Sequence, residues 1–165
     1  MKKWSLLFIP IVFFCLSSSA QSQRTSDSLY NPFNNPKVGD YLTIPILWGC
    51  SPNINPDVAK NLDEHVITVI KNYPNLIFRL ESHSDCRADS AYNRDFTQRR
   101  AEIMMEYLID QQVDTSRIKT VGIGEDNLFI KKCNCELSDY ERKCTEAEYQ
   151  LNRRTVLRII AIKEN

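Results

Sequence analysis

The sequence predicts an α/β two-layer sandwich, in which two helices cover one small sheet in the order β-α-β-α-β-insertion-β. Short apolar, β-prone runs alternate with two stretches whose apolar residues recur at helical spacing. The chain of 165 residues provides enough material for a single hydrophobic core. The sequence contains no internal repeats and no low-complexity tracts, so a repeat architecture is excluded.

The first strand and the first helix have clear boundaries in the sequence. Residues 41–48 are apolar and β-prone, and Pro45 favours an edge strand or a bulge because proline lacks an amide donor. Asn55 is a suitable N-cap, and Pro56 suits the first position of a helix. Pro74 ends this helix.

The remaining elements follow in the same alternation. Residues 75–82 predict a short second strand, and residues 89–112 predict a helix with one apolar face. Residues 116–126 predict a third strand that ends in a Gly-rich turn. Residues 131–150 carry many charges and little periodicity, which indicates a loop or insertion, and residues 154–163 predict the closing strand.

The N-terminal segment predicts export. Residues 1–20 have the build of a secretory signal, with two lysines, a short apolar run and small residues before the cleavage site. The polar, Asn- and Pro-rich residues 21–37 predict a flexible linker. Residues 38–165 then form the domain, with the cysteine-bearing insertion at 131–150. We expect a periplasmic protein, and association with the outer membrane stays an open alternative.

Charge and motif content exclude several functions. The 21 basic residues balance 21 acidic residues, so no overall field attracts nucleic acid. No serine or cysteine nucleophile has a base at a suitable spacing, and no Gly-rich phosphate loop is present. We therefore expect a protein that is not an enzyme and that binds no cofactor.

The cysteines predict disulfide bonds. Cys15 falls within the predicted signal, and five cysteines remain after cleavage. In an exported protein disulfides are the default expectation, and an odd number of cysteines leaves one thiol free or paired to another chain. The five candidates are Cys50, Cys86, Cys133, Cys135 and Cys144.

Two pairings and one alternative follow from the positions of these cysteines. Cys50 and Cys86 each follow a predicted strand, and neighbouring parallel strands would bring them together as a disulfide. Cys144 can pair with either of the two other cysteines of the insertion. A metal site built on His83, Asp85 and Cys86, or on the insertion cysteines, matches no standard zinc spacing, so we expect no metal.

An acid and a base are spaced so that they can share a ligand. Asp85 follows the second strand, where loops of α/β sheets gather ligands. Arg100 shares a helix face with Asn93 and leans toward the helix N-terminus, and so toward Asp85. Such a pair suits a small zwitterion, with its ammonium on Asp85 and its carboxylate on Arg100. The alternative is a plain salt bridge between Asp85 and Arg100.

Four motifs along the chain carry a resemblance to a known family. They are "SHSD" (82–85), "NRDFTQRRAEIMMEYL" (93–108), "GIGE" (122–125) and "NRR" (152–154). In this order they resemble the C-terminal domain shared by OmpA, the peptidoglycan-associated lipoprotein Pal and the stator protein MotB. The resemblance runs from about Val38 to Ile162.

This resemblance implies non-covalent binding of peptidoglycan through the diaminopimelate of its stem peptide. It places the diaminopimelate between Asp85 and Arg100. The further candidates are Ser84, which keeps the motif's hydroxyl, Asn93, which would order the loop, and Arg154, which would brace the site. Envelope proteins are a further class of expected partner, and nucleic acid is not.

One departure from the family pattern supports an alternative function. Many relatives have Phe-Asp at the end of the first strand, where this chain has Gly49 and Cys50. The lost carboxylate favours a structural or interaction protein of an envelope assembly, with the same fold and with weak or no peptidoglycan binding.

Overall fold

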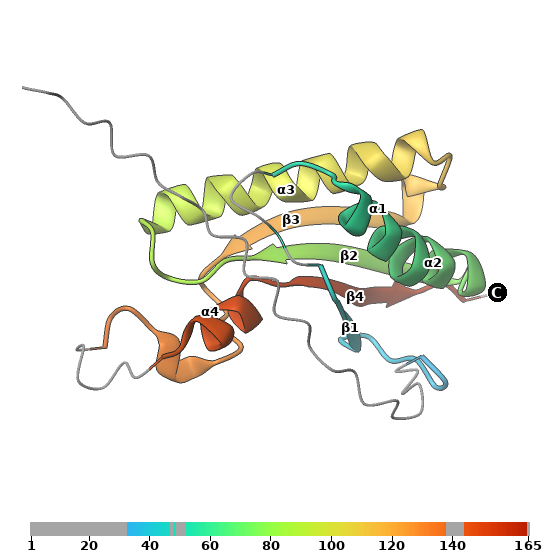
Figure 1. The fold of residues 1–165 in the computed structure, drawn as a ribbon. Helices are drawn as coiled ribbons and strands as arrows, with labels where there is room; N and C mark the ends of the chain where they lie inside the picture. Colours follow the sequence, from blue (N-terminus) through green and yellow to red (C-terminus); the bar gives the residue numbers. More distant parts are fainter. Residues whose placement is uncertain (1–32, 47, 49–51, 138–143, 165) are drawn as a thin grey trace, which may run out of the picture.

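The computed structural model describes residues 33–46, 48, 52–137 and 144–164. Its centre is a four-stranded sheet in the order β1-β4-β2-β3 (Figure 1). The strands are β1 (Tyr41–Ile44), β2 (Leu76–His83), β3 (Ile118–Gly124) and β4 (Thr155–Ile162). β4 pairs antiparallel with both β1 and β2, whereas β2 and β3 are parallel.

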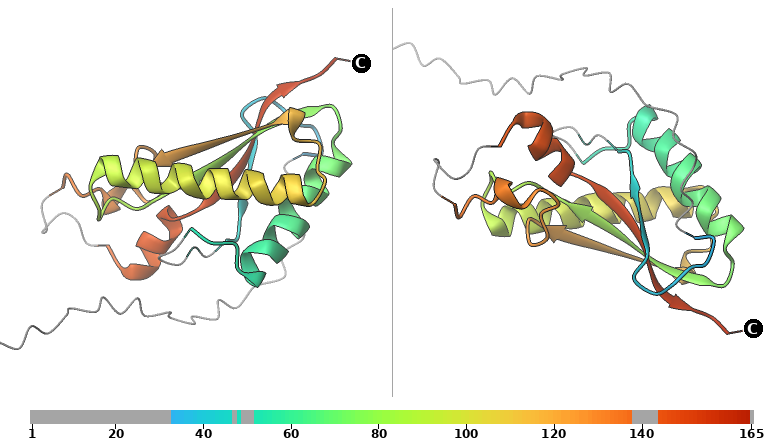
Figure 2. Two further views of the ribbon diagram at one scale, coloured as in Figure 1. Left: turned by 90° about the horizontal axis from the view of Figure 1, so that it is seen from above. Right: turned by 90° about the horizontal axis from the view of Figure 1, so that it is seen from below.

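The long helix α3 (Ser90–Asp110) connects the two parallel strands and packs along them (Figure 2). The first helical region is continuous but changes type, from α1 through the π-helical η1 to α2. The helical bounds are α1 (Pro56–Leu62), η1 (Asp63–Ile67), α2 (Thr68–Asn72), η2 (Thr115–Arg117), η3 (Lys131–Cys133) and α4 (Glu146–Asn152). None of the helices in the described part of the chain has the length and apolar character of a membrane span.

The predicted sandwich and its element order are confirmed. β1 lies at the edge of the sheet and ends just before Pro45, as expected for a residue that cannot donate to a ladder. Asn55 caps α1, because its side-chain oxygen accepts from the Val58 amide at 2.9 Å.

One hydrophobic core joins the helices to the sheet. On β2, Leu76, Phe78 and Leu80 alternate toward this core, where Leu62 of α1 and Met104 of α3 are also fully buried. These side chains pack α3 against the sheet. The position of every residue on α3 therefore depends on this core.

The core extends into the segment predicted as a linker. Phe33 is 2% exposed and its ring meets those of Tyr73 and Phe78 edge-on, at centroid distances of 5.5 and 6.2 Å. The folded part therefore begins no later than Phe33. The predicted signal and most of the predicted linker lie outside the described residues.

Two expectations about the fold are wrong. The sequence placed the strands that became β1 and β2 side by side, but β4 inserts between them. The 131–150 segment was predicted to be a loop or insertion without helical periodicity, but it includes η3 and the start of α4. A capping box of Thr145 and Glu148 starts this helix. Seven residues are too few for an apolar period to show in the sequence.

Gly122 sets the distance between β3 and α3. A Cβ added there would lie 2.5 Å from the Gln98 Cα and 2.6 Å from the Thr97 carbonyl carbon. Its amide also donates to the Gln98 side chain at 2.9 Å. Only glycine fits this approach of a strand to a helix backbone.

Gly122→Ala is therefore expected to lower the free energy of unfolding by about 2 kcal/mol, because α3 must move away from the sheet. Urea unfolding of the mature chain measures the loss. Lys119→Ala, an exposed change on the same strand, is the control and should stay within about 0.5 kcal/mol of the parent. Equal stability of the two variants would contradict this account of the glycine.

Candidate functional site

The loop from β2 to α3 carries Asp85 and is held in place by the start of α3. Asp89 caps the helix by accepting from the Ala91 amide at 2.9 Å. The Asn93 side-chain amide donates to the backbone carbonyls of Asp85 and Ala88, at 3.1 and 3.2 Å, and also to Glu125. Asn93 therefore orders this loop.

Arg100 lies two helical turns further along α3, in an aromatic setting. Only 2% of the residue is exposed, and its guanidinium carbon lies 4.3 Å from the ring centroid of Phe96 and 5.0 Å from that of Trp48. The Trp48 indole N–H donates to the Thr155 hydroxyl at 2.9 Å, which fixes one wall. Thus β4 and α3 both hold the surroundings of Arg100.

Asp85 and Arg100 influence one another electrostatically. Burial is the main cause that lowers the pKa of Arg100, and the nearby charge of Arg153 adds to it, whereas Tyr92 and Asp85 act in the opposite direction; together they lower the pKa to about 10. The guanidinium therefore stays protonated at neutral pH, as a buried cation that is close enough to Asp85 to feel its charge.

Arg87 and Arg153 form the salt bridges that the structure describes for Asp85. The carboxylate accepts from Arg87 at 2.9 and 3.2 Å and from Arg153 at 2.5 Å. Burial alone would raise the pKa of Asp85, but these hydrogen bonds outweigh it and hold the pKa below its usual range. Asp85 is therefore an ionised acceptor at neutral pH.

Glu146, the first residue of α4, binds the same two arginines. Its carboxylate accepts from Arg87 at 2.7 Å and from Arg153 at 2.6 Å. Arg87 also lies over the Tyr149 ring, at 4.4 Å from the centroid. The insertion is thus part of the wall around Asp85.

The other two candidates, Ser84 and Arg154, lie in different surroundings. Ser84 is 6% exposed, and no hydrogen-bond partner from the described part of the chain reaches its hydroxyl oxygen. Arg154 donates to the Asn127 carbonyl at 2.9 Å and lies over the Phe129 ring. The neighbouring Arg153, not Arg154, reaches Asp85.

The structure joins Cys86 to Cys135 and Cys133 to Cys144, with Cα–Cα distances of 5.6 and 5.3 Å. The expected Cys50–Cys86 disulfide is therefore wrong. β4 separates the two strand ends that were to bring these cysteines together, and Cys50 itself lies outside the described residues. For Cys144 the structure selects Cys133 from the two partners left open.

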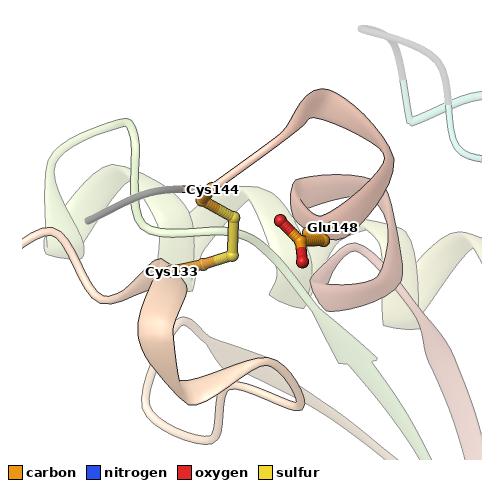
Figure 3. Close-up of side chains that lie close together, drawn as sticks. All are labelled: Cys133, Cys144 and Glu148. Atoms are coloured by element: carbon orange, nitrogen blue, oxygen red, sulfur yellow. A yellow bond between two sulfur atoms is a disulfide. The ribbon is translucent and has the colours of Figure 1, made fainter. Parts of the chain in front are cut away.

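One group of potential metal ligands lies close together in the described part of the chain: Cys133, Cys144 and Glu148 (Figure 3). The two cysteines are linked to each other, so neither offers a thiolate. Glu148 pairs with Lys132 at 2.6 Å and closes the capping box of α4. These contacts hold η3 and the start of α4 together.

His83 belongs to a separate network beside the site. Its ring lies 3.3 Å from Glu81, which also accepts from Arg158 and Arg79, each at 2.7 Å. Burial lowers the pKa of His83, although the hydrogen bond to Glu81 opposes this shift. A neutral, buried histidine of this kind supports the end of β2.

Sequence reasoning predicted none of the contacts that Arg87, Arg153 and Glu146 make around Asp85. Arg153 is the C-cap of α4 and precedes β4, and no periodic pattern at such a junction indicates which way a side chain points. No local signal identified Glu146, because its approach to Asp85 depends on the folding of the insertion.

The chain belongs to the OmpA family, whose family model matches residues 51–142, more than half of the chain. Curated relatives include the peptidoglycan-associated lipoprotein of Rhizobium meliloti (strain 1021). It is 32% identical over 76 residues, which are 46% of this chain and 43% of the relative. The probable lipoprotein YiaD of Escherichia coli (strain K12) is 36% identical over 86 residues, 52% of this chain and 39% of YiaD. The chain thus matches less than half the length of these relatives.

Solved structures share the fold at lower identity. The peptidoglycan-associated lipoprotein of Burkholderia pseudomallei aligns with a TM-score of 0.53 and 22% identity, over 78% of this chain and 99% of that chain. The periplasmic domain of Helicobacter pylori MotB aligns with a TM-score of 0.55 and 15% identity, over 76% and 78% of the two chains. The family match and these relatives agree with the expectation that the chain is not an enzyme.

The lowered pKa of Asp85 predicts a pH-dependent contribution to stability. Asp85→Asn should lower the free energy of unfolding by about 2 kcal/mol at pH 7, because charged hydrogen bonds to two arginines are lost. A lowered folded-state pKa gives stability that is present above the ordinary value of 3.8 and is lost as the pH falls through the folded value. The difference between parent and variant should therefore shrink as the pH falls below the ordinary value of 3.8.

Urea unfolding across this pH range measures that difference. Asp95→Asn changes an exposed carboxylate on α3 and is the control, for which we expect a difference below about 0.5 kcal/mol at pH 7. A parent-minus-variant difference that does not change with pH would contradict the coupling of Asp85 to the arginines.

Proposed function

We propose that this chain binds peptidoglycan non-covalently, through the diaminopimelate residue of the stem peptide, as a periplasmic module associated with the cell wall. The ammonium of diaminopimelate binds Asp85 and its carboxylate binds Arg100. Ser84 donates or accepts at the centre of the site, Asn93 holds the loop, and Arg154 braces the sheet beside it.

The observation that carries this proposal is the pair of opposite charges at one rim of the sheet. Asp85 is ionised and Arg100 is protonated, and both are within electrostatic reach of one another. The buried Ser84 hydroxyl, whose oxygen has no partner among the described residues, gives a ligand a further hydrogen bond. A zwitterion satisfies all three groups together.

The family and the names of the relatives support the same function. Two of the curated relatives, from Rhizobium meliloti (strain 1021) and Agrobacterium fabrum, are named as peptidoglycan-associated lipoproteins. Residues 1–20 would act as the secretory signal and residues 21–32 as a tether. Residues from Phe33 onward would form the domain. Envelope proteins would be further partners, at the outer membrane or elsewhere in the periplasm.

The hydrogen bonds that Asp85 accepts within the protein favour a second function. Asp85 already accepts hydrogen bonds from Arg87 and Arg153, and a carboxylate neutralised in this way can serve structure alone. The chain would then be a structural or interaction protein of an envelope assembly, with weak or no peptidoglycan binding.

Titration with a diaminopimelate-containing muropeptide, followed by calorimetry, separates the two functions. Asp85→Asn and Arg100→Lys should each weaken binding about tenfold or more, because each removes one charged or bidentate contact. Asp95→Asn and Arg99→Lys, an exposed ion pair on the same helix, are the matched controls and should bind like the parent.

The same titration with a lysine-containing muropeptide tests the role of the ligand carboxylate. Lysine lacks the second carboxylate, so we expect about tenfold weaker binding to the parent and no further loss on Arg100→Lys. If the site variants bind like the parent, the function as a binding module is wrong and the assembly function remains.

A further inference from the structure

Four charged side chains form a closed ring at the mouth of the site. Asp85 and Glu146 are the acids, and Arg87 and Arg153 are the bases. Each arginine donates to both acids, so every member of this charge ring has two partners within it. Two members come from the loop after β2, and two come from the segment around α4.

The two carboxylate oxygens of Asp85 accept unequal numbers of hydrogen bonds. Oδ2 accepts three hydrogen bonds: from Nε and Nη2 of Arg87, at 3.2 and 2.9 Å, and from Nη1 of Arg153. Among the described residues, Oδ1 accepts from the Arg87 backbone amide alone, at 3.1 Å. A carboxylate oxygen has two lone pairs, so Oδ1 retains capacity for one more donor.

Glu146 holds the remaining amino group of Arg87. Its carboxylate accepts from Nη1 of Arg87 at 2.7 Å and from Nη2 of Arg153 at 2.6 Å, and the Gln150 side-chain oxygen also accepts from Nε and Nη2 of Arg153. An arginine near a carboxylate otherwise prefers a fork that covers both oxygens. For Arg87, Glu146 thus draws one amino group away from Asp85.

We propose that Glu146 is a positioning residue, which keeps Oδ1 of Asp85 open to the ammonium of the ligand. This inference rests on the proposed function and adds a selectivity element that the cysteine-bearing insertion supplies. Without the Glu146 carboxylate, Arg87 turns fully onto Asp85 and competes with the ligand's ammonium, whereas Gln150 still holds Arg153.

Covalent bonds fix Glu146 opposite Asp85 although its side chain is 64% exposed. Cys86, the neighbour of Asp85, is joined to Cys135, and Cys133 is joined to Cys144, two residues before Glu146. The capping box at Thr145 then sets the direction of α4. This chain of restraints reduces the entropy lost when the ring forms.

Binding of the diaminopimelate muropeptide by the mature, oxidised chain tests the proposal. Glu146→Gln should weaken binding about tenfold, which corresponds to about 1.4 kcal/mol. Arg87→Ala removes the competing guanidinium but also its hydrogen bonds to Asp85, so its own affinity is the reference against which the double variant is compared. The double variant should bind like Arg87→Ala, since the arginine that Glu146 restrains is then absent.

The outcomes are separable. Equal affinities of the double variant and Arg87→Ala support the positioning role. If Glu146→Gln weakens binding in the Arg87→Ala background as much as in the parent, or leaves the parent's binding unchanged, the proposal is overturned. Glu106→Gln, an exposed change on α3, is the control.

The Asp85→Asn variant distinguishes failure of the role proposed for Glu146 from failure of the proposed peptidoglycan binding. If Asp85→Asn abolishes binding but Glu146→Gln does not weaken it, peptidoglycan binding stands and the role of Glu146 falls. If Asp85→Asn binds like the parent, both proposals fall together.

Discussion

The buried negative charge of Asp85 is the constraint on which the rim of this domain depends. A carboxylate with a 10% exposed side chain is unfavourable in a folded protein unless donors surround it. Arg87 supplies both its backbone amide and its guanidinium, and Arg153 approaches from the start of β4. These contacts join the loop after β2 to the junction of α4 and β4, 68 residues later in the sequence, and Glu146 then brings α4 to the same arginines.

The sheet topology makes this meeting possible. Because β4 lies between β1 and β2 and runs antiparallel to both, the start of β4 lies beside the ends of its neighbours. Arg153 therefore reaches the rim where Asp85 follows β2. The close approach of β3 to α3 at Gly122 holds the helix that carries Arg100 against the same sheet. The packing of the core and the positions of the site residues therefore both follow from this order of strands and from the packing of α3 on the sheet.

The insertion differs in character from the rest of the domain. It is stabilised by two disulfides and a capping box rather than by the hydrophobic core, and its helix is only seven residues long. Such a segment can change in sequence without disturbing the sheet. Its Glu146 nevertheless pairs with Arg87 and Arg153, the two arginines that hold Asp85 beside the sheet.

The sequence by itself determined the sandwich and the order of its main elements. Periodicity, caps and prolines are local signals, which the sequence carries directly. Strand neighbours, the Cys86–Cys135 pairing and the ring around Asp85 were decided only by tertiary structure. Each of these depends on contacts between distant segments, whose energies come from burial and charge in three dimensions and leave no periodic trace along the chain.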